Sequence, residues 1–282
     1  MTTLLRELRC GRFELSLAQP LIMGIVNVTD DSFSGDGLAG DAARAVEHGL
    51  RLVEEGAQIL DIGGESSRPG ALPVAAGQEL ARVLPVLEGL RDCGVPISVD
   101  TAKPEVMHVA LAGGADMIND IAALQTPGAL EAVAASQCAV CLMHMQGEPR
   151  TMQQAPRYAD VVAEVAAFFR ERVAVAASAG IARERIVIDP GFCFGKTIEH
   201  NLVLLRCLGE LRTDGLPLLA GLSRKSMLGQ LTGRPSGERV HASVAAALLA
   251  VQRGATIVRV HDVAATRDAL AILNALTASD EH

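Results

Sequence analysis

Carboxylate and amide side chains stand where short aliphatic runs of this sequence end. Asp61, Asp100 and Asp189 each close such a run, and Asn119 closes another. A flat heterocycle with amino and amide groups needs acceptors in its plane and one matched amide partner, because each unpaired buried polar group costs about 1–3 kcal/mol. These side chains therefore predict a site for a planar polar ring. An alternative, that Asp100 followed by Thr101 merely caps the next helix, accounts for one carboxylate but not for three.

Cationic side chains end two later runs. Arg259 and His261 lie two residues apart, so they share one face of the expected strand. Lys225 ends the run before them, and Arg68 follows Ser67 in an earlier loop, where its fork suits paired phosphate oxygens. Any single arginine could form a surface salt bridge instead. Their convergence predicts a phosphorylated substrate but does not say which one.

Eight aliphatic runs must position these side chains. Most are separated by segments whose apolar residues are spaced as in an amphipathic helix. The runs are LIMGIVNVT, AQILDIGGESSR, VPISVDT, ADMINDI, AVCLMHM, RIVIDPG, PLLAGLSRK and ATIVRVHDV. Eight β–α units predict an α/β fold, a single-domain (β/α)8 TIM barrel with its active site at the carboxyl ends of the strands. We expect a lead-in over residues 1–20 and the barrel over residues 21–277.

Helix signals fall between the runs. Asp41 is placed to cap a helix over AARAVEHGLRLVEEGA, and Pro104 and Pro127 stand near the starts of two others. Gly-Ala pairs recur where helices should end, which predicts turns with glycine as the C-cap. These pairs are at 56–57, 114–115 and 254–255. Other helices are expected over QELARVLPVLEGLRD, KPEVMHVALAGG, PGALEAVAAS, YADVVAEVAAFFRERVAVAASAG, EHNLVLLRCLGEL, RVHASVAAALLAVQRG and ATRDALAILNAL.

Composition narrows the class of protein. The 282 residues, 49% hydrophobic, suit one large core, and the net charge of −8 argues against a nucleic-acid or membrane-surface partner. Charges interrupt the apolar runs of the N-terminal segment, and no apolar stretch reaches the ~18 residues of a membrane span. The six cysteines lack disulfide spacing, which indicates a reducing compartment. Cys138 and Cys141, three apart in a strand, should point to opposite faces.

Eight segments resemble, in order and spacing, the signature segments of the dihydropteroate synthases. They are MGIVNVTDDSFS, DIGGESSRPGA, SVDT, INDI, MHMQG, DPGFCFGK, GLSRKS and RVHDV, from about Met23 to Asp262. The resemblance implies a pterin-binding barrel. It implies that 6-hydroxymethyl-7,8-dihydropterin pyrophosphate is joined to p-aminobenzoate, giving 7,8-dihydropteroate and pyrophosphate for folate synthesis. It further implies Mg²⁺, inhibition by sulfonamides, a cytoplasmic location and a homodimer, through Ala-rich late helices such as SVAAALLAV.

The resemblance also assigns roles by position. The expected pterin residues are Asp61, Asp100, Asn119, Met143, Asp189 and Lys225. The expected pyrophosphate residues are Asn27, Ser67, Arg68, Arg259 and His261, with Asn27 also binding Mg²⁺. The expected p-aminobenzoate residues are Phe33, Ser67, Pro69, Phe194, Lys225 and Ser226. The expected catalytic residues are Asp100, Lys225, Arg259 and His261.

Several positions depart from the family pattern. Asp30 stands where the first loop usually has proline, which frees φ and adds a charge, so the affinity of the loop's ligands is in question. Ser67 replaces a threonine, and Cys193 replaces the glycine of DPGxGFGK beside Phe194. Sulfonamides mimic p-aminobenzoate, so altered sulfonamide sensitivity is expected. Phe33 is expected to close over the substrate, although packing against its own loop is the alternative.

Two rival functions remain. A barrel that transfers a methyl group from methyltetrahydrofolate would share the Asp and Asn residues but would not need Ser67 and Arg68 or the pair of Arg259 and His261. A non-catalytic paralogue would bind pterin without condensing it, and the altered first loop keeps this alternative open.

Overall fold

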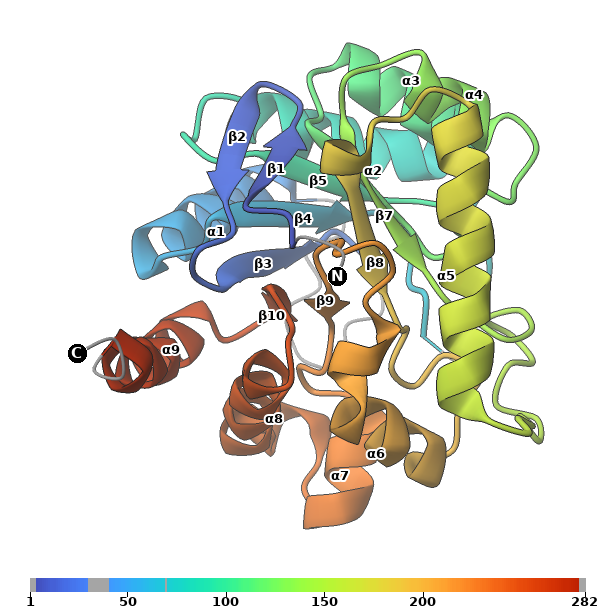
Figure 1. Cartoon of the computed structure of the whole chain (residues 1–282). Coiled ribbons are helices and arrows are strands. Elements are labelled where there is room, and N and C mark those ends of the chain that lie inside the picture. Colours follow the sequence, from blue (N-terminus) through green and yellow to red (C-terminus); the bar gives the residue numbers. More distant parts are fainter. Residues whose placement is uncertain (1–3, 30–40, 69, 279–282) are drawn as a thin grey trace.

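Eight parallel strands form the centre of the fold, in the order β8-β7-β6-β5-β4-β3-β10-β9 (Figure 1). The computed structural model describes residues 4–29, 41–68 and 70–278. A parallel bridge between Ile188 and Leu218 joins β8 to the segment that enters β9, so the sheet nearly closes into the expected barrel. The strands are β3 Leu21–Asn27, β4 Ile59–Gly63, β5 Ile97–Asp100, β6 Met117–Asp120, β7 Ala139–Met143, β8 Ile186–Asp189, β9 Leu219–Ala220 and β10 Ile257–Val260.

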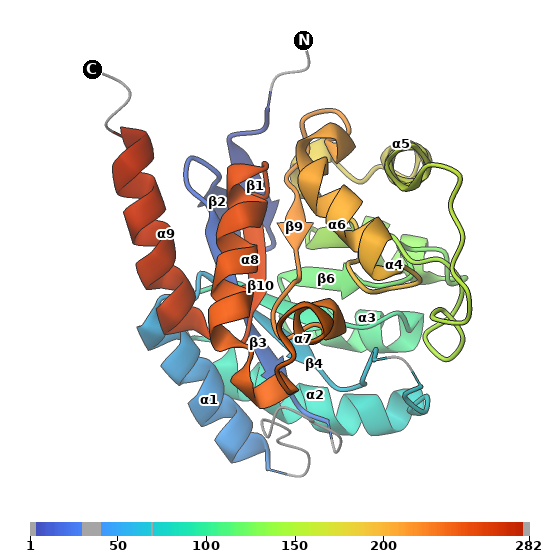
Figure 2. The same cartoon turned by 90° about the horizontal axis from the view of Figure 1, so that it is seen from below.

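Helices connect the strands and cover the outside of the sheet (Figures 1 and 2). Each of the expected helices is present. A further short helix, α7, lies between β9 and α8, where no helix was expected. The bounds are α1 Ala42–Glu55, α2 Ala76–Leu90, α3 Pro104–Ala112, α4 Ala129–Ala134, α5 Val161–Ser178, α6 Ile198–Arg206, α7 Ser226–Thr232, α8 Val240–Gln252 and α9 Val263–Ala278. No helix in the described part of the chain is long and apolar enough to cross a membrane.

Glycine ends three of these helices in the same way. Gly56, Gly114 and Gly254 have φ angles of 111°, 101° and 109°, a region that favours glycine. In each case the following alanine donates its N–H to the carbonyl five residues back, at 2.9, 3.0 and 2.9 Å. This pairing is part of the Schellman motif, and it confirms the turn predicted from the Gly-Ala pairs. The cap at the other end of α1 is also confirmed, because Asp41 accepts from the N–H of Arg44 at 3.0 Å.

The core has an outer layer between sheet and helices and a smaller inner layer inside the barrel. Cys138 belongs to the outer layer and Cys141 to the inner one, which confirms that the two thiols face opposite ways. The inner layer comprises Leu8, Cys10, Leu21, Met23, Ile59, Met117, Ala139, Cys141, Val187, Leu219 and Ile257. Most of its strand residues come from the strands' amino ends, so this end of the barrel is filled.

An N-terminal hairpin closes that end, and the sequence pattern did not reveal it. Strands β1 (Glu7–Cys10) and β2 (Phe13–Ser16) pair antiparallel, and β1 turns side chains into the inner layer. Arg12 in the turn donates Nε and Nη2 to the buried carboxylate of Asp116, each at 2.9 Å. The hairpin therefore seals the amino ends of the strands, which leaves the carboxyl ends for chemistry. The expected boundary at residue 20 stays a prediction.

Candidate active site at the carboxyl ends of the strands

The strand register brings the predicted polar side chains to one end of the barrel. Asp100 pairs with Gly63 on one side and Asn119 on the other, and Met143 pairs with Asp189. Residues paired across parallel strands point to the same face, so these side chains lie together at the carboxyl ends of the strands. We call this end of the barrel the mouth.

Arg259 lies at the centre of this mouth. Its Nε donates to Asp61 Oδ2 at 2.6 Å and its Nη2 donates to Asp100 Oδ2 at 3.0 Å. Asn119 Nδ2 donates to the same oxygen of Asp61 at 3.1 Å. Asp61 is fully buried, and its Oδ1 has no hydrogen-bond partner among the described residues. A buried acceptor of this kind suits a donor supplied by a ligand.

The electrostatics of the mouth set Asp100 apart. Burial raises the pKa of Asp100 to about 7. Arg259 and Lys225 oppose that rise, whereas the charges of Asp61 and Glu79 add to it. The group can therefore change charge near neutral pH.

Burial and neighbouring charges also shift the pKa values of Asp189 and Lys225. Burial raises the pKa of Asp189, against a 2.8 Å hydrogen bond from the N–H of Gly191 and the positive charge of Lys225. Burial also lowers the pKa of Lys225, with Arg259 pushing in the same direction. Asp189 and Lys225 thus lie close enough to Arg259 for the three charges to affect one another.

An apolar wall completes one side of the mouth. Phe194, Met143 and Met152 form a small buried cluster. Lys225 Nζ lies 4.2 Å from the centre of the Phe194 ring, a cation–π contact. Ser226 follows Lys225 as the first residue of α7 and is exposed. Ring faces, thioethers and an amine thus meet beside the carboxylates.

Hydrogen bonds and an ion pair between the segments after β9 and β10 hold His261 and Arg224 in place. Ser223 Oγ lies 2.9 Å from His261 Nδ1 and accepts from the backbone N–H of His261 at 3.2 Å, which holds the imidazole in one orientation. Arg224 pairs with Asp262 at 2.7 Å. Sequence reasoning placed Ser223 in the run but gave it no role.

Lys196, which sequence reasoning missed, organises the loop after β8. Its buried Nζ donates to the carbonyls of Gly191 and Phe194 at 3.0 and 2.9 Å and lies 2.9 Å from His144 Nδ1. Burial lowers the pKa of His144 to about 3, so the imidazole is neutral and accepts from Lys196. His144 also meets Phe168 of α5 edge to face, with centroids 4.9 Å apart. It therefore faces the helix layer, although it ends a strand.

The remaining predicted residues lie at the end of β3 and on the loops after β3 and β4. A methyl group built on Gly63 would lie 3.8 Å from Asn27 Oδ1 and 4.0 Å from Asp100 Oδ2, so Asn27 borders the mouth. Ser67 and Arg68 are half-buried on the loop that follows β4. Asp30, Phe33 and Pro69 lie outside the described residues, so their expected roles stay predictions.

Cys193 has a backbone conformation that favours glycine, with φ of 68°. We expect Cys193→Gly to change the free energy of unfolding by less than about 1 kcal/mol, because relief of this strain offsets the lost burial. Cys193→Val adds a β-branch in the same conformation and should lower the stability by about 2 kcal/mol. Urea unfolding of both variants measures this. Equal stability of the valine variant and the parent would contradict it.

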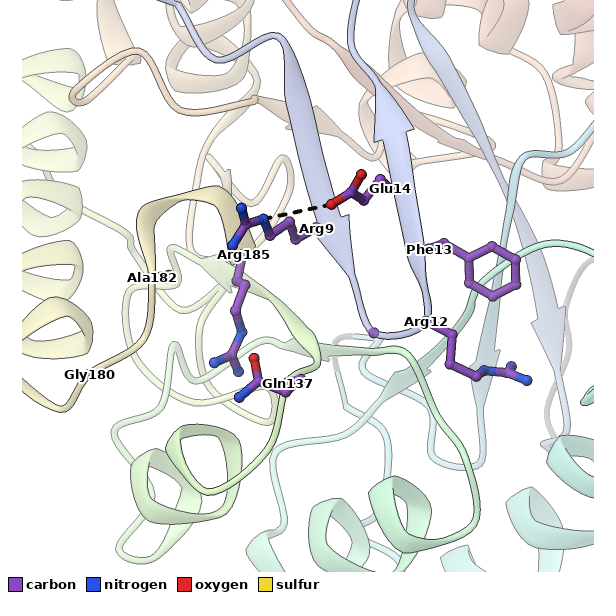
Figure 3. Close-up of a pocket in the computed structure, with 9 residues that line it drawn as sticks. Arg9, Arg12, Phe13, Glu14, Gln137, Gly180, Ala182 and Arg185 are labelled. Atoms are coloured by element: carbon purple, nitrogen blue, oxygen red, sulfur yellow. Dashed lines mark ion pairs between the residues drawn. The ribbon is translucent and has the colours of Figure 1, made fainter.

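A separate polar cavity of about 510 Å³ lies at the opposite end of the barrel (Figure 3). Its lining residues are Arg9, Gly11, Arg12, Phe13, Glu14, Gln137, Gly180, Ala182 and Arg185. The arginines already have protein partners: Arg185 bonds the carbonyls of Cys138 and Val133, Arg12 bonds Asp116, and Arg9 lies 3.9 Å from Glu14. The chemistry-bearing groups gather in the mouth, and we assign the candidate active site there.

Comparisons with known proteins agree with this geometry. The family described as pterin binding enzyme matches residues 23–261. A dihydropteroate synthase of Neisseria meningitidis serogroup C is 55% identical over 273 residues, covering 95% of this chain and 96% of that protein. The Yersinia pestis dihydropteroate synthase in a sulfonamide drug complex aligns with a TM-score of 0.94 at 47% identity, covering 96% and 99% of the two chains. The Burkholderia cenocepacia enzyme complexed with 7,8-dihydropteroate aligns with a TM-score of 0.91 at 52% identity, covering 99% of each. From these matches, the chain belongs to the dihydropteroate synthase family of pterin-binding enzymes.

Proposed function

We propose that this chain condenses 6-hydroxymethyl-7,8-dihydropterin pyrophosphate with p-aminobenzoate, releasing pyrophosphate and forming 7,8-dihydropteroate for folate synthesis. One observation carries the proposal: Arg259, a group suited to phosphate, donates to both Asp61 and Asp100, which suit a polar ring. The substrate needs these two kinds of group side by side, because its diphosphate is joined to its ring through one carbon. The 7,8-dihydropteroate complex of the Burkholderia cenocepacia relative supports the same product.

The pterin ring binds among the acceptors of the mouth. Asn119 and Asp189 supply a matched amide and a carboxylate for the ring's amino and amide edge, and Asp61 Oδ1 offers a further buried acceptor. Met143 covers a ring face from β7, and Lys225 donates at the opposite edge. Each of these groups is buried or nearly so, and therefore each gains most from a ligand that pairs it.

The diphosphate binds among the cations and hydroxyls. Arg259 and His261 approach it from β10, while Ser67 and Arg68 approach from the loop after β4. Pyrophosphate leaves readily only if its developing charge is neutralised, and donors already held in place do this without reorganisation. The hydrogen bonds between Ser223 and His261 hold the imidazole in this way.

The p-aminobenzoate subsite lies against the apolar wall. Phe194 offers its ring face, Lys225 its ammonium and Ser226 a hydroxyl, and Ser67 of the loop after β4 is proposed as a further contact. Phe33 and Pro69 belong to the same proposal. Because sulfonamides occupy this subsite in the proposal, Cys193→Gly should change their inhibition constant; equal inhibition of the two proteins would remove the basis for a role of Cys193.

Magnesium completes the proposed site, with Asn27 as its protein ligand. The amide oxygen of Asn27 and the carboxylate of Asp100 flank the same position beside Gly63. Mg²⁺ takes oxygen ligands and is usually held by one or two side chains together with substrate phosphates and water, so this oxygen fits it. When bound, the ion would neutralise part of the charge on the leaving diphosphate.

The proposed reaction breaks the carbon–oxygen bond before the carbon–nitrogen bond forms. The diphosphate leaves with the bonding electrons, stabilised by Arg259, Arg68 and His261. The positive charge left on the pterin is spread over the ring and stabilised by the nearby carboxylate of Asp100. The arylamine is a weak nucleophile and needs mainly positioning over the reactive carbon, which Phe194 and Lys225 supply. The new bond forms as the nitrogen gives up a proton to water or to the released pyrophosphate.

Purified protein mixed with the pterin pyrophosphate, p-aminobenzoate and Mg²⁺ tests the proposal through pyrophosphate release. Release that depends on p-aminobenzoate supports the synthase. Tight pterin binding without release would instead indicate a non-catalytic paralogue. Methyl transfer from methyltetrahydrofolate, with no release, would indicate the methyltransferase barrel.

The pH dependence of kcat/KM should follow the ionisation of Asp100. Its pKa is raised to about 7 and the carboxylate is the active form, so kcat/KM for the pterin substrate should rise with pH through about 7. Asp100→Asn should remove this limb and lower kcat more than it weakens pterin binding. Phosphate groups of the substrate also titrate near pH 6, so the variant is the control. An unchanged limb in Asp100→Asn, or equal losses in turnover and binding, would contradict the assignment.

The proposal includes a cytoplasmic homodimer. All six cysteines are free, as suits a reducing compartment. Helices α8 and α9 lie side by side (Figure 2), and they expose Leu249, Ile272 and Leu276. Exposed apolar side chains on two neighbouring helices suit contact with a second copy of the chain. Sedimentation of the protein and of Ile272→Asp tests this: a monomeric parent protein would overturn it.

A further inference from the structure

A partly buried charge cluster joins three segments of the chain. Lys103 Nζ donates to Glu65 Oε2 and, at 2.5 Å, to Glu79 Oε2. Glu79 belongs to α2 and its side chain is fully buried, whereas the side chains of Lys103 and Glu65 are 24% and 26% exposed. Glu65 lies on the loop after β4, and Lys103 immediately precedes α3. One ammonium thus fastens two carboxylates from separate elements.

The cluster closes the loop that carries Ser67 and Arg68. Glu65 uses its second oxygen, Oε1, to accept from the N–H of Val74 at 2.8 Å, which bridges the loop on itself. Arg82 of α2 donates to the carbonyl of Gly64 at 2.9 Å, at the start of the loop. The position of the loop therefore depends on Glu65, and Lys103 holds Glu65.

The same lysine is tied to the strand end that bears Asp100. The backbone N–H of Lys103 donates to Thr101 Oγ1 at 3.3 Å, and the N–H of Thr101 donates to the carbonyl of Asn119 at 3.1 Å. Helices α2 and α3, which flank the cluster, pack side by side (Figure 2). Lys103 thus links the loop of Arg68 to the ring-binding edge of the barrel.

Lys103 stays protonated at neutral pH. Burial lowers its pKa, but the hydrogen bonds and charges of Glu65 and Glu79 outweigh that, and the net pKa is raised. The ammonium therefore persists across the neutral range. Glu79 contributes in turn to the raised pKa of Asp100, so the cluster also acts on the mouth electrostatically.

We propose that Lys103 is a positioning residue for the diphosphate half of the substrate, acting through Glu65 on the loop of Ser67 and Arg68. The inference rests on the proposed function, because it takes that loop as a diphosphate contact. Lys103 itself faces two carboxylates and does not touch the substrate. Its loss should weaken diphosphate binding selectively and leave the ring subsite intact.

The informative variant is Lys103→Met combined with Glu79→Gln. Lys103→Met alone would leave the Glu79 charge buried without a cation and so risk unfolding. The double variant removes both charges, so its net charge equals that of the parent. Arg234→Met combined with Glu238→Gln, which removes the exposed pair of Arg234 and Glu238, is the matched control for the loss of an ion pair elsewhere. Lys103→Arg keeps the charge and should retain most of the diphosphate affinity.

Calorimetry on the full chain would measure binding of inorganic pyrophosphate with Mg²⁺ and, separately, of 6-hydroxymethylpterin. In the double variant we expect pyrophosphate affinity to fall about tenfold and pterin affinity to stay within about twofold. In turnover, KM for the pterin pyrophosphate should rise more than kcat falls. Hydrogen exchange at the Val74 amide should be faster, because its acceptor Glu65 is no longer held.

Two results would overturn the inference. Unchanged pyrophosphate affinity would show that the loop does not need Lys103, and equal losses for pyrophosphate and pterin would show a merely structural role. Failure of the proposed function looks different, because the parent protein itself would then release no pyrophosphate in turnover, whether or not it binds the pterin.

Discussion

Arg259→Ala is expected to lower kcat/KM for pyrophosphate release by about 10³-fold, because donors at a developing phosphate charge contribute on this scale. The arginine is also the cation shared by Asp61 and Asp100, at 2.6 and 3.0 Å. Its removal leaves a fully buried carboxylate facing a second one, and breaking such a pair costs about 3–5 kcal/mol of stability. Activity should therefore be measured below the unfolding temperature of the variant, which circular dichroism gives.

Two further variants separate catalysis from stability. Arg259→Met with Asp61→Asn removes both members of one buried pair, so stability should recover while turnover stays low. Arg12→Ala breaks the bidentate pair with Asp116 at the opposite end of the barrel. It should lose stability but keep turnover within about twofold, since no group of the mouth changes. Comparable loss of turnover in Arg12→Ala and Arg259→Ala would refute a direct role of Arg259.

The barrel was predictable because its signals are local and repeated. Each aliphatic run ends at a polar group, and the Gly-Ala pairs mark helix ends by a backbone requirement that glycine meets. The hairpin was missed because its strands have four residues each and charged or polar residues at alternate positions, a pattern that also suits an exposed segment. Helix α7 has seven residues, too few to show a helical period.

The mouth was predictable as a group of residues but not as a set of contacts. Strand ends in a barrel converge, so Asp61, Asp100 and Arg259 had to be near one another, yet nothing local says that one guanidinium serves both carboxylates. The orientation of His144 was available from alternation: it follows Met143, which faces inward, so it had to face outward. The role of Lys196 could not be predicted from the sequence, because its carbonyl partners become neighbours only after the loop folds.

Gly191→Ala is expected to disrupt this loop, with a loss of at least about 3 kcal/mol in the free energy of unfolding. An added methyl group would lie 2.0 Å from the carbonyl oxygen of His144, and φ is 63°. That carbonyl belongs to the backbone, so the clash can be relieved only by separating the loop after β8 from the end of β7. The N–H of Gly191 donates to Asp189 and its carbonyl accepts from Lys196, so both would shift.

Gly180→Ala provides the matched control for the loss expected of Gly191→Ala. Gly180 also has positive φ, 87°, but an added methyl group would meet nothing within 4 Å. Gly180→Ala should lower the free energy of unfolding by about 1 kcal/mol, because it adds only the cost of a non-glycine residue at positive φ and no steric clash. Urea unfolding gives both values, and pterin binding should weaken only in Gly191→Ala, because the shift reaches Asp189. Equal losses of stability would mean that backbone conformation, and not the close approach of two strand-end segments, determines the need for glycine at position 191.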